Sequence, residues 1–283
     1  MVLQMSSNTN NDNSSTTRGG DDDDGGRSSS RNAAKHRKKH LPKVIIFDLD
    51  GCLWRPEMYE LLYFSGGFGA PFTVPPPKSS DDDDDNKDTT NDGSITTLLT
   101  CNGEPVYLLG DVADIFRELY TDSVWQQQQQ PNDNNNNKVR VGISSRTDQP
   151  DWARELLRKF QITTTTTTTN EATNDSSNDN NTMFSLHDVI DDTIIEISSG
   201  SKVTHFQNIK ETTGVSYNDM IFFDNEYGNC EQVSKTLGVL VGYCPKTGVT
   251  KEIWDATLLA FDNFYNNGSG GDGSGGGGRI IQV

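Results

Sequence analysis

The chain has 283 residues, of which only 32% are hydrophobic, and it carries a net charge of −17. An apolar content this low means that part of the chain cannot form a packed core. The four segments with the most apolar residues, about 41–75, 104–125, 138–160 and 184–265, still hold 24 Asp and Glu against 14 Lys and Arg. An acidic core of this kind argues against nucleic acid as the ligand, because nucleic-acid-binding surfaces are basic.

Low-complexity stretches rich in Asp, Asn, Gln, Thr, Ser and Gly separate these four segments. Added length in a surface loop costs little free energy, so such stretches are tolerated as insertions. We predict a disordered segment at 1–40, one domain at 41–265 with loop insertions at about 76–103, 126–137 and 161–183, and a flexible Gly-rich tail at 266–283.

The sequence also contains features that indicate the cellular compartment of the protein. It holds no apolar run of membrane-spanning length and no signal peptide, so a membrane protein is not expected. Cys52, Cys101, Cys230 and Cys244 show neither a zinc pattern nor a dense disulfide framework. We therefore expect a soluble, cytoplasmic protein. The basic cluster KHRKKH at 35–40 is a candidate nuclear import signal, although such clusters also flank domains without that role.

Short runs rich in Val, Ile and Phe alternate with stretches of helical period. In chain order, we predict strands at 43–47, 139–144, 193–198, 220–223 and 238–243. Helices are predicted at about 112–119, 152–160, 203–213, 227–237 and 249–264. Asp111 and Asp148 are expected to cap the first two helices, with Pro150 in the first turn of the second. The alternation predicts an α/β fold with a mainly parallel sheet covered on both faces.

Polar residues follow the first four predicted strands, and ligands of such sheets bind at the carboxyl ends of the strands. The residues at these ends are Asp48 and Asp50; Ser144, Ser145 and Arg146; Lys202, after a short loop; and Asp224, Asn225 and Glu226.

Together these groups could hold a hard cation such as Mg²⁺ beside a phosphate. Each residue alone has a simpler explanation. Asp50 and Gly51 could form a plain turn, Ser145 could cap a helix, and Lys202 could be a solvated lysine. The prediction therefore depends on all of them meeting at one sheet edge.

Four motifs in this order resemble the haloacid dehalogenase (HAD) superfamily: FDLDGC at 47–52, ISSRT at 143–147, GSKVTHF at 200–206 and FFDNE at 222–226. Together with LPKVIIFDLDGCLW, they are similar to the magnesium-dependent phosphatase family, a eukaryotic acid-phosphatase-type branch. The resemblance implies a HAD-like Rossmannoid three-layer sandwich. No substantial cap domain is expected, because the segments after the first two motifs are too polar to fold as one.

The resemblance also implies roles for these residues. Asp48 would be the nucleophile that forms an aspartyl-phosphate, and Asp50 the general acid and base. Ser145 and Lys202 would bind the transferring phosphoryl group. Arg146 and the backbone of Leu49 would contact substrate as well. Mg²⁺ would be held by Asp48, Asp50, Asp224 and Asn225.

Two positions depart from the family pattern. Cys52 stands where a loop-supporting Thr is usual, which we expect to weaken the site modestly. Asn225 stands where a second Asp is usual, and the lost negative charge is expected to lower the affinity for Mg²⁺.

The function these residues predict is a Mg²⁺-dependent phosphomonoester hydrolase. Its expected substrates are phosphotyrosine or phosphorylated sugars of the fructosamine type, on a small molecule or a phosphoprotein. One alternative is a receiver-like or degenerate phosphate-binding module without turnover. Another is a phosphotransferase that passes the phosphoryl group to a sugar hydroxyl.

Overall fold

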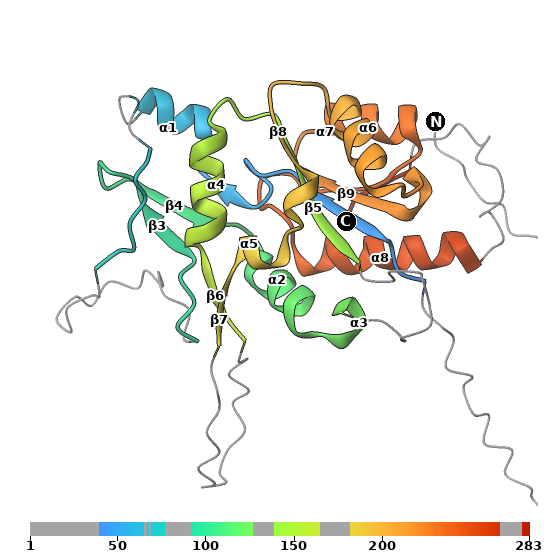
Figure 1. Ribbon diagram of the computed structural model, residues 1–283, viewed down its shortest axis with the longest axis horizontal. Coiled ribbons are helices and arrows are strands. Elements are labelled where there is room, and N and C mark those ends of the chain that lie inside the picture. The colour runs from blue at the N-terminus through green and yellow to red at the C-terminus, as the bar shows by residue number, and fades with distance from the viewer. Residues whose placement is uncertain are drawn as a thin grey trace, which may run out of the picture. The chain divides into compact units, whose positions relative to one another are not determined.

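The computed structural model describes residues 40–64, 67, 69–76, 92–126, 139–164, 182–266 and 279–283. All of them belong to one compact unit, residues 39–283 (Figure 1). The predicted disordered segment up to residue 39, most of the basic cluster, the greater part of each insertion and the Gly-rich part of the tail lie outside the described residues.

A central sheet of six strands organises this unit, in the order β11-β10-β9-β1-β5-β8. The strands are β1 (Val44–Phe47), β5 (Arg140–Ser145), β8 (Ile195–Ile197), β9 (Met220–Asp224), β10 (Leu240–Tyr243) and β11 (Arg279–Ile281). Every ladder in the sheet is parallel. The predicted α/β fold with a mainly parallel sheet is therefore confirmed.

Strand β1 lies at the centre, and its register fixes the position of the site. Phe47 pairs with Ile143 of β5 on one side and with Phe223 of β9 on the other. The next residues along the three strands are Asp48, Ser144 and Asp224, so a buried apolar strand delivers these three polar residues to one sheet edge.

The side chains of β1 alternate between two apolar layers, as a strand covered on both faces requires. Ile45 and Phe47 pack in the cluster that includes α2 (Val112–Thr121) and α8 (Lys251–Asn266). Val44 and Ile46 pack in the cluster that includes α6 (Lys202–Thr213) and α7 (Tyr227–Leu237). Figure 1 shows α6 and α7 on one side of the sheet and α8 on the other.

Of the two predicted N-cap residues, Asp111 occupies the N-cap position and Asp148 does not. Asp111 is the N-cap residue of α2, and its carboxylate accepts a hydrogen bond from the backbone of Lys251. The N-cap of α4 (Pro150–Lys159) is Gln149, so the prediction of Asp148 was wrong. Pro150 occupies the first helical position, which makes the residue before it the cap. Asp148 lies one residue further out and faces the candidate site.

Smaller elements complete the unit. They are β2 (Trp54–Arg55), β3 (Thr97–Leu99), β4 (Pro105–Leu108), β6 (Gln161–Thr163), β7 (Met183–Ser185), α1 (Met58–Phe64), α3 (Ser123–Gln126), α5 (Leu186–Val189) and the 3₁₀ turns Asp192–Ile194 and Tyr217–Asp219. Strands β2, β4 and β3 form an antiparallel sheet, and β6 pairs with β7. Among the described residues, these elements build no domain of cap size between β1 and β5.

Three short strands and the first residue of a fourth occupy ranges that we expected to be unstructured. β3 lies within the predicted insertion 76–103, β6 and the first residue of β7 lie within 161–183, and β11 lies in the predicted flexible tail. Each has only three residues, too few to show a period in the sequence, and each is held by a ladder to a neighbouring strand.

None of the helices in the described part of the chain combines the length and the apolar composition needed to cross a bilayer.

Candidate active site

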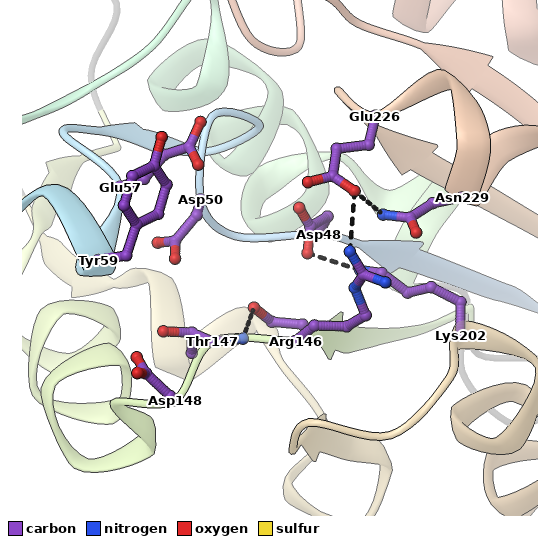
Figure 2. Close-up of a pocket in the computed structure, with 11 residues that line it drawn as sticks. Asp48, Asp50, Glu57, Tyr59, Arg146, Thr147, Asp148, Lys202, Glu226 and Asn229 are labelled. Atoms are coloured by element: carbon purple, nitrogen blue, oxygen red, sulfur yellow. Dashed lines mark hydrogen bonds and ion pairs between the residues drawn. The ribbon is translucent and has the colours of Figure 1, made fainter.

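A cleft of about 330 Å³ opens where the predicted polar residues meet. Its lining consists of Asp48, Asp50, Glu57, Tyr59, Ser145, Arg146, Thr147, Asp148, Lys202, Glu226 and Asn229. Figure 2 shows Asp48 and Asp50 after β1, Arg146, Thr147 and Asp148 after β5, Glu226 after β9 and Lys202 at the start of α6 around the cleft, together with Glu57, Tyr59 and Asn229. The four residues predicted to be catalytic, Asp48, Asp50, Ser145 and Lys202, all lie in this cleft.

Asp48 and Lys202 form the buried centre of the cleft. The Lys202 ammonium group donates to Oδ1 of Asp48 at 2.7 Å, and the two residues are 1% and 6% exposed. The backbone N–H of Asp48 donates to the Phe223 carbonyl at 2.9 Å, which fixes the start of the loop. Ser201 caps α6 by accepting from the backbone N–H of Thr204, so Lys202 stands at the first helical position.

Asp224 is the second carboxylate beside Lys202. Its Oδ2 lies 3.2 Å from Nζ, its Oδ1 accepts from the backbone N–H of Glu226 at 2.7 Å, and Asn229 donates to Oδ2 at 3.1 Å. Burial outweighs these partners and raises the pKa of Asp224 to about 7. Burial also acts to lower the pKa of Lys202, but Asp48 and Asp224 overcome it, so that pKa is raised and the ammonium group stays charged.

Asp50 lies two residues beyond Asp48 and is held by two donors. Trp54 Nε1 donates to its Oδ1 at 2.9 Å, and the backbone N–H of Met58 donates to its Oδ2 at 3.2 Å. Burial, followed by the charge of Asp48, raises the pKa of Asp50 to about 7 in spite of both hydrogen bonds. A carboxyl group of this kind is protonated in a substantial fraction of molecules at neutral pH, as a general acid requires.

Oxygen atoms suited to a hard cation meet beside Asp48. With its nitrogen turned toward the loop, the Asn225 side-chain amide donates to the backbone oxygen of Asp50 at 3.0 Å and to Oδ2 of Asp48 at 3.3 Å. With its oxygen turned there instead, the amide completes a set of three oxygens from three residues. Carboxylate, amide and backbone oxygens are the ligands that Mg²⁺ prefers, so the residues fit this ion.

This donor set does not depend on a cluster of charged ligands. Within the described ranges, no group of three or more His, Cys, Asp or Glu side chains is placed to hold a metal ion. Gly51 keeps the loop close to Asn225: its φ is +71°, and a Cβ there would collide with the Asn225 amide.

The predicted substrate contacts fall into two groups. Ser145 and Arg146 line the cleft, and Arg146 reaches across it to Oε2 of Glu226 at 3.0 Å (Figure 2). Both members of this ion pair are about half exposed, so its net stabilisation is small. The side chain of Leu49 is fully buried in the core, which leaves only its backbone for contact with a ligand.

Five residues of the cleft were not among the strand-end residues predicted from the sequence. They are Glu57, Tyr59, Thr147, Asp148 and Asn229. Thr147 and Asp148 directly follow Arg146, so the strand-end pattern could have included them. Glu226 was among the strand-end residues, although no role was predicted for it. Asn229 lies in the first turn of α7, one helical turn after Glu226. Glu57 and Tyr59 come from the segment after β2, where no pattern in the sequence indicates a site.

Cys52 supports the loop in the place of the usual Thr. Its Sγ lies 3.5 Å from the carbonyl oxygen of Phe223, which is also the acceptor for the backbone of Asp48. The Cys244 thiol lies 3.5 Å away on the other side. Burial, and then the neighbouring Cys244, raise the pKa of Cys52, so the group stays a neutral thiol and can donate.

The sequence model of the Acid Phosphatase family matches residues 40–264. The chain belongs to the acid phosphatase family. The matched range contains every residue of the cleft, and the resemblance predicted from the four motifs is confirmed.

Two relatives of this acid phosphatase family member are similar along most of their length. Magnesium-dependent phosphatase 1 of Homo sapiens is 27% identical over 199 residues, which are 70% of this chain and 76% of that protein. A HAD-like hydrolase superfamily protein of Schizosaccharomyces pombe is 26% identical over 191 residues, 67% of this chain and 79% of that protein.

Among solved structures, the chain is similar to the N-terminal part of a Bacteroides fragilis protein, described as containing a phosphatase domain complexed with Mg. The TM-score is 0.40 at 15% identity, over 77% of this chain and 40% of that one.

Proposed function

We propose that the chain is a Mg²⁺-dependent phosphomonoester hydrolase that works through an aspartyl-phosphate on Asp48. The observation that carries the proposal is the arrangement at the end of β1. There the carboxylate of Asp48 is held by Lys202 at 2.7 Å, and a second carboxyl group, Asp50, follows two residues later in the same cleft. Membership of the acid phosphatase family supports the same chemistry.

In the first step, an oxygen of Asp48 attacks the phosphorus atom of the substrate. The bond between phosphorus and the ester oxygen breaks, and the leaving oxygen takes a proton from Asp50. Lys202 holds the Asp48 carboxylate in place and offsets part of the phosphoryl charge. In the second step, Asp50 takes a proton from water as the water attacks phosphorus, which releases phosphate and restores Asp48.

Mg²⁺ would be held by the carboxylate of Asp48, the backbone oxygen of Asp50 and the Asn225 amide oxygen. When bound, it would reduce the repulsion between the carboxylates and the phosphoryl group. A relative named as magnesium-dependent supports this choice of ion. Asp224, predicted as a fourth ligand, would have to give up contacts to Lys202, Glu226 or Asn229 in order to join.

Phosphate contacts would come from Ser145, Arg146 and the backbone of Leu49. The half-exposed pair of Arg146 and Glu226 is weak enough to be exchanged for a phosphate oxygen. No cap-sized domain lies among the described residues between β1 and β5, so an open cleft suits exposed phosphates. We propose phosphotyrosine or phosphorylated sugars of the fructosamine type as substrates, on a small molecule or a phosphoprotein.

The test is turnover of an aryl phosphate with Mg²⁺ by the wild type, Asp48→Asn and Asp151→Asn. Asp151→Asn makes the same change of group at an exposed position on α4. We expect full activity in this control and none in Asp48→Asn, with both variants still folded. Unchanged turnover in Asp48→Asn would contradict the proposal. A stable phosphoryl adduct without turnover would instead indicate a regulatory module, and transfer to an added sugar would indicate a phosphotransferase.

A further inference from the structure

His205 is a buried histidine that the chemistry above does not use. It lies on α6, one turn after Lys202, and is 1% exposed. Burial, and then the positive charge of Lys202, lower the pKa of His205, so the ring is neutral at neutral pH. A neutral imidazole has one nitrogen that donates and one that accepts, and both nitrogens have a partner here.

The two partners come from the ends of neighbouring strands. Nδ1 of His205 lies 3.1 Å from the hydroxyl of Ser144 at the end of β5. Nε2 lies 2.9 Å from the hydroxyl of Ser198, just after β8. Gly200 leaves room for the ring, since a Cβ there would lie only 3.3 Å from Nε2. One side chain thus joins α6 to the carboxyl ends of two strands.

Ser144 connects this network to the catalytic centre. Its carbonyl oxygen accepts a hydrogen bond from the Lys202 ammonium group. It also precedes Ser145, whose own carbonyl accepts from the backbone of Ser198 at 3.1 Å. Ser144 is fully buried, so its hydroxyl has no water to replace His205, whereas Ser198 is exposed. An unpaired buried hydroxyl is costly, so loss of His205 should make the backbone at Ser144 rearrange.

We propose that His205 is a positioning residue that fixes the Ser144 carbonyl, and through it the place of Lys202 beside Asp48. This inference rests on the proposed function for its effect on turnover, but its effect on Lys202 is independent of turnover. A long, flexible lysine side chain needs fixed acceptors to stay in one place, and Ser144 supplies the one acceptor of the three that is not a carboxylate.

The kinetic test compares His205→Phe, Ser144→Ala and the double variant in turnover of an aryl phosphate. Each single change should lower kcat about 10- to 100-fold, because misplaced groups lose transition-state contacts. KM should change less than about threefold. The double variant should be no slower than His205→Phe. Unchanged kcat in the folded single variants, or losses that multiply in the double variant, would overturn the proposal.

Two conservative variants separate the two hydrogen bonds. Asn places a polar atom near the position of Nδ1, and Gln near that of Nε2. We therefore expect His205→Asn to keep most of the activity and His205→Gln to lose it. The reverse order would show that Ser198, rather than Ser144, is the partner that matters. The matched control is Thr257→Val, which removes a buried hydroxyl that donates to Ile253 in α8; it should leave kcat unchanged.

A second readout does not depend on activity. In the wild type, the ammonium protons of a fixed and buried Lys202 should exchange slowly with water and give a signal in a ¹H–¹⁵N correlation spectrum. The signal should be lost in His205→Phe and Ser144→Ala and kept in Thr257→Val. Its retention in all three would overturn the proposal even if the wild type proved inactive, whereas inactivity of the wild type alone would contradict only the proposed function.

Discussion

Lys202 Nζ lies 2.7 Å from Oδ1 of Asp48, although 154 residues separate the two in the chain. The same ammonium group is 3.2 Å from Asp224, so one buried cation serves two buried carboxylates. Removal of one member of a buried charged group is strongly destabilising, because the others are left unpaired. Lys202 should therefore matter for folding as well as for chemistry.

Replacement of Lys202 by Met should abolish turnover and lower the free energy of unfolding by about 3–5 kcal/mol. Asp224→Asn, added to Lys202→Met, removes one of the two unpaired carboxylates and should restore part of the stability but none of the activity. Urea unfolding of both variants measures this. Equal stability of the single and the double variant would show that the Lys202 ammonium group does not stabilise the charged form of Asp224.

Asn225→Asp places a third negative group beside Asp48 and Asp50. Without Mg²⁺ the added charge replaces two hydrogen bonds with repulsion, so the melting temperature should fall in the presence of a chelator. The affinity for Mg²⁺ should rise, measured as the dependence of melting temperature on Mg²⁺ concentration. Gln207→Glu, the same amide-to-carboxylate change at an exposed position of α6, should alter neither. An unchanged Mg²⁺ affinity in Asn225→Asp would remove Asn225 from the ligand set.

Cys52 should act through its hydrogen bond to Phe223, since the same carbonyl holds the backbone of Asp48. Cys52→Ser keeps a donor at this position, and kcat should stay within about threefold of the wild type. Cys52→Ala removes the donor and should lower kcat further. Steady-state kinetics of the two variants decides the point, and equal kcat values would mean that the thiol only fills space.

The stability of the protein should depend on pH through His205. Because its pKa is lowered in the folded protein from 6.5, the unfolded chain binds more protons just below that pH. The free energy of unfolding therefore decreases through His205 as the pH falls below about 6.5, whereas above that pH His205 does not change it. Denaturant unfolding at about pH 7 and about pH 5 should show a larger loss for the wild type than for His205→Asn. Parallel losses would mean that His205 titrates normally.

The sequence predicted the parts of the structure that long apolar runs determine. The run Val44–Phe47 is buried on both faces, and a buried run can be recognised without knowledge of its neighbours. Once the strands are recognised, the parallel order alone brings Asp48, Ser145 and Lys202 to one edge. Lys202 was predictable for a second reason, since Ser201 before it is a standard helix cap.

The remaining features depend on contacts between distant segments. Strands β3 and β11 have three residues each, and only their partners β4 and β10 make them strands. Asp148 is of a residue type that is favoured at helix N-caps. Because Pro150 occupies the first helical position of α4, however, the N-cap is Gln149. Glu57 and Tyr59 reach the cleft because β2 pairs with β4, and no local pattern indicates that pairing.

The proposed mechanism requires that Asp48 becomes phosphorylated during turnover. Rapid acid quenching of the wild type with an aryl phosphate and Mg²⁺, followed by mass spectrometry of peptides, tests it directly. We predict a gain of one phosphoryl group on the peptide that contains Asp48, and no such gain in Asp48→Asn. In Asp50→Asn the phosphoryl group should persist for longer, provided that the substrate has a leaving group good enough for the first step to proceed without the general acid. Turnover without any phosphoryl group on that peptide, or the group on another residue, would contradict the account.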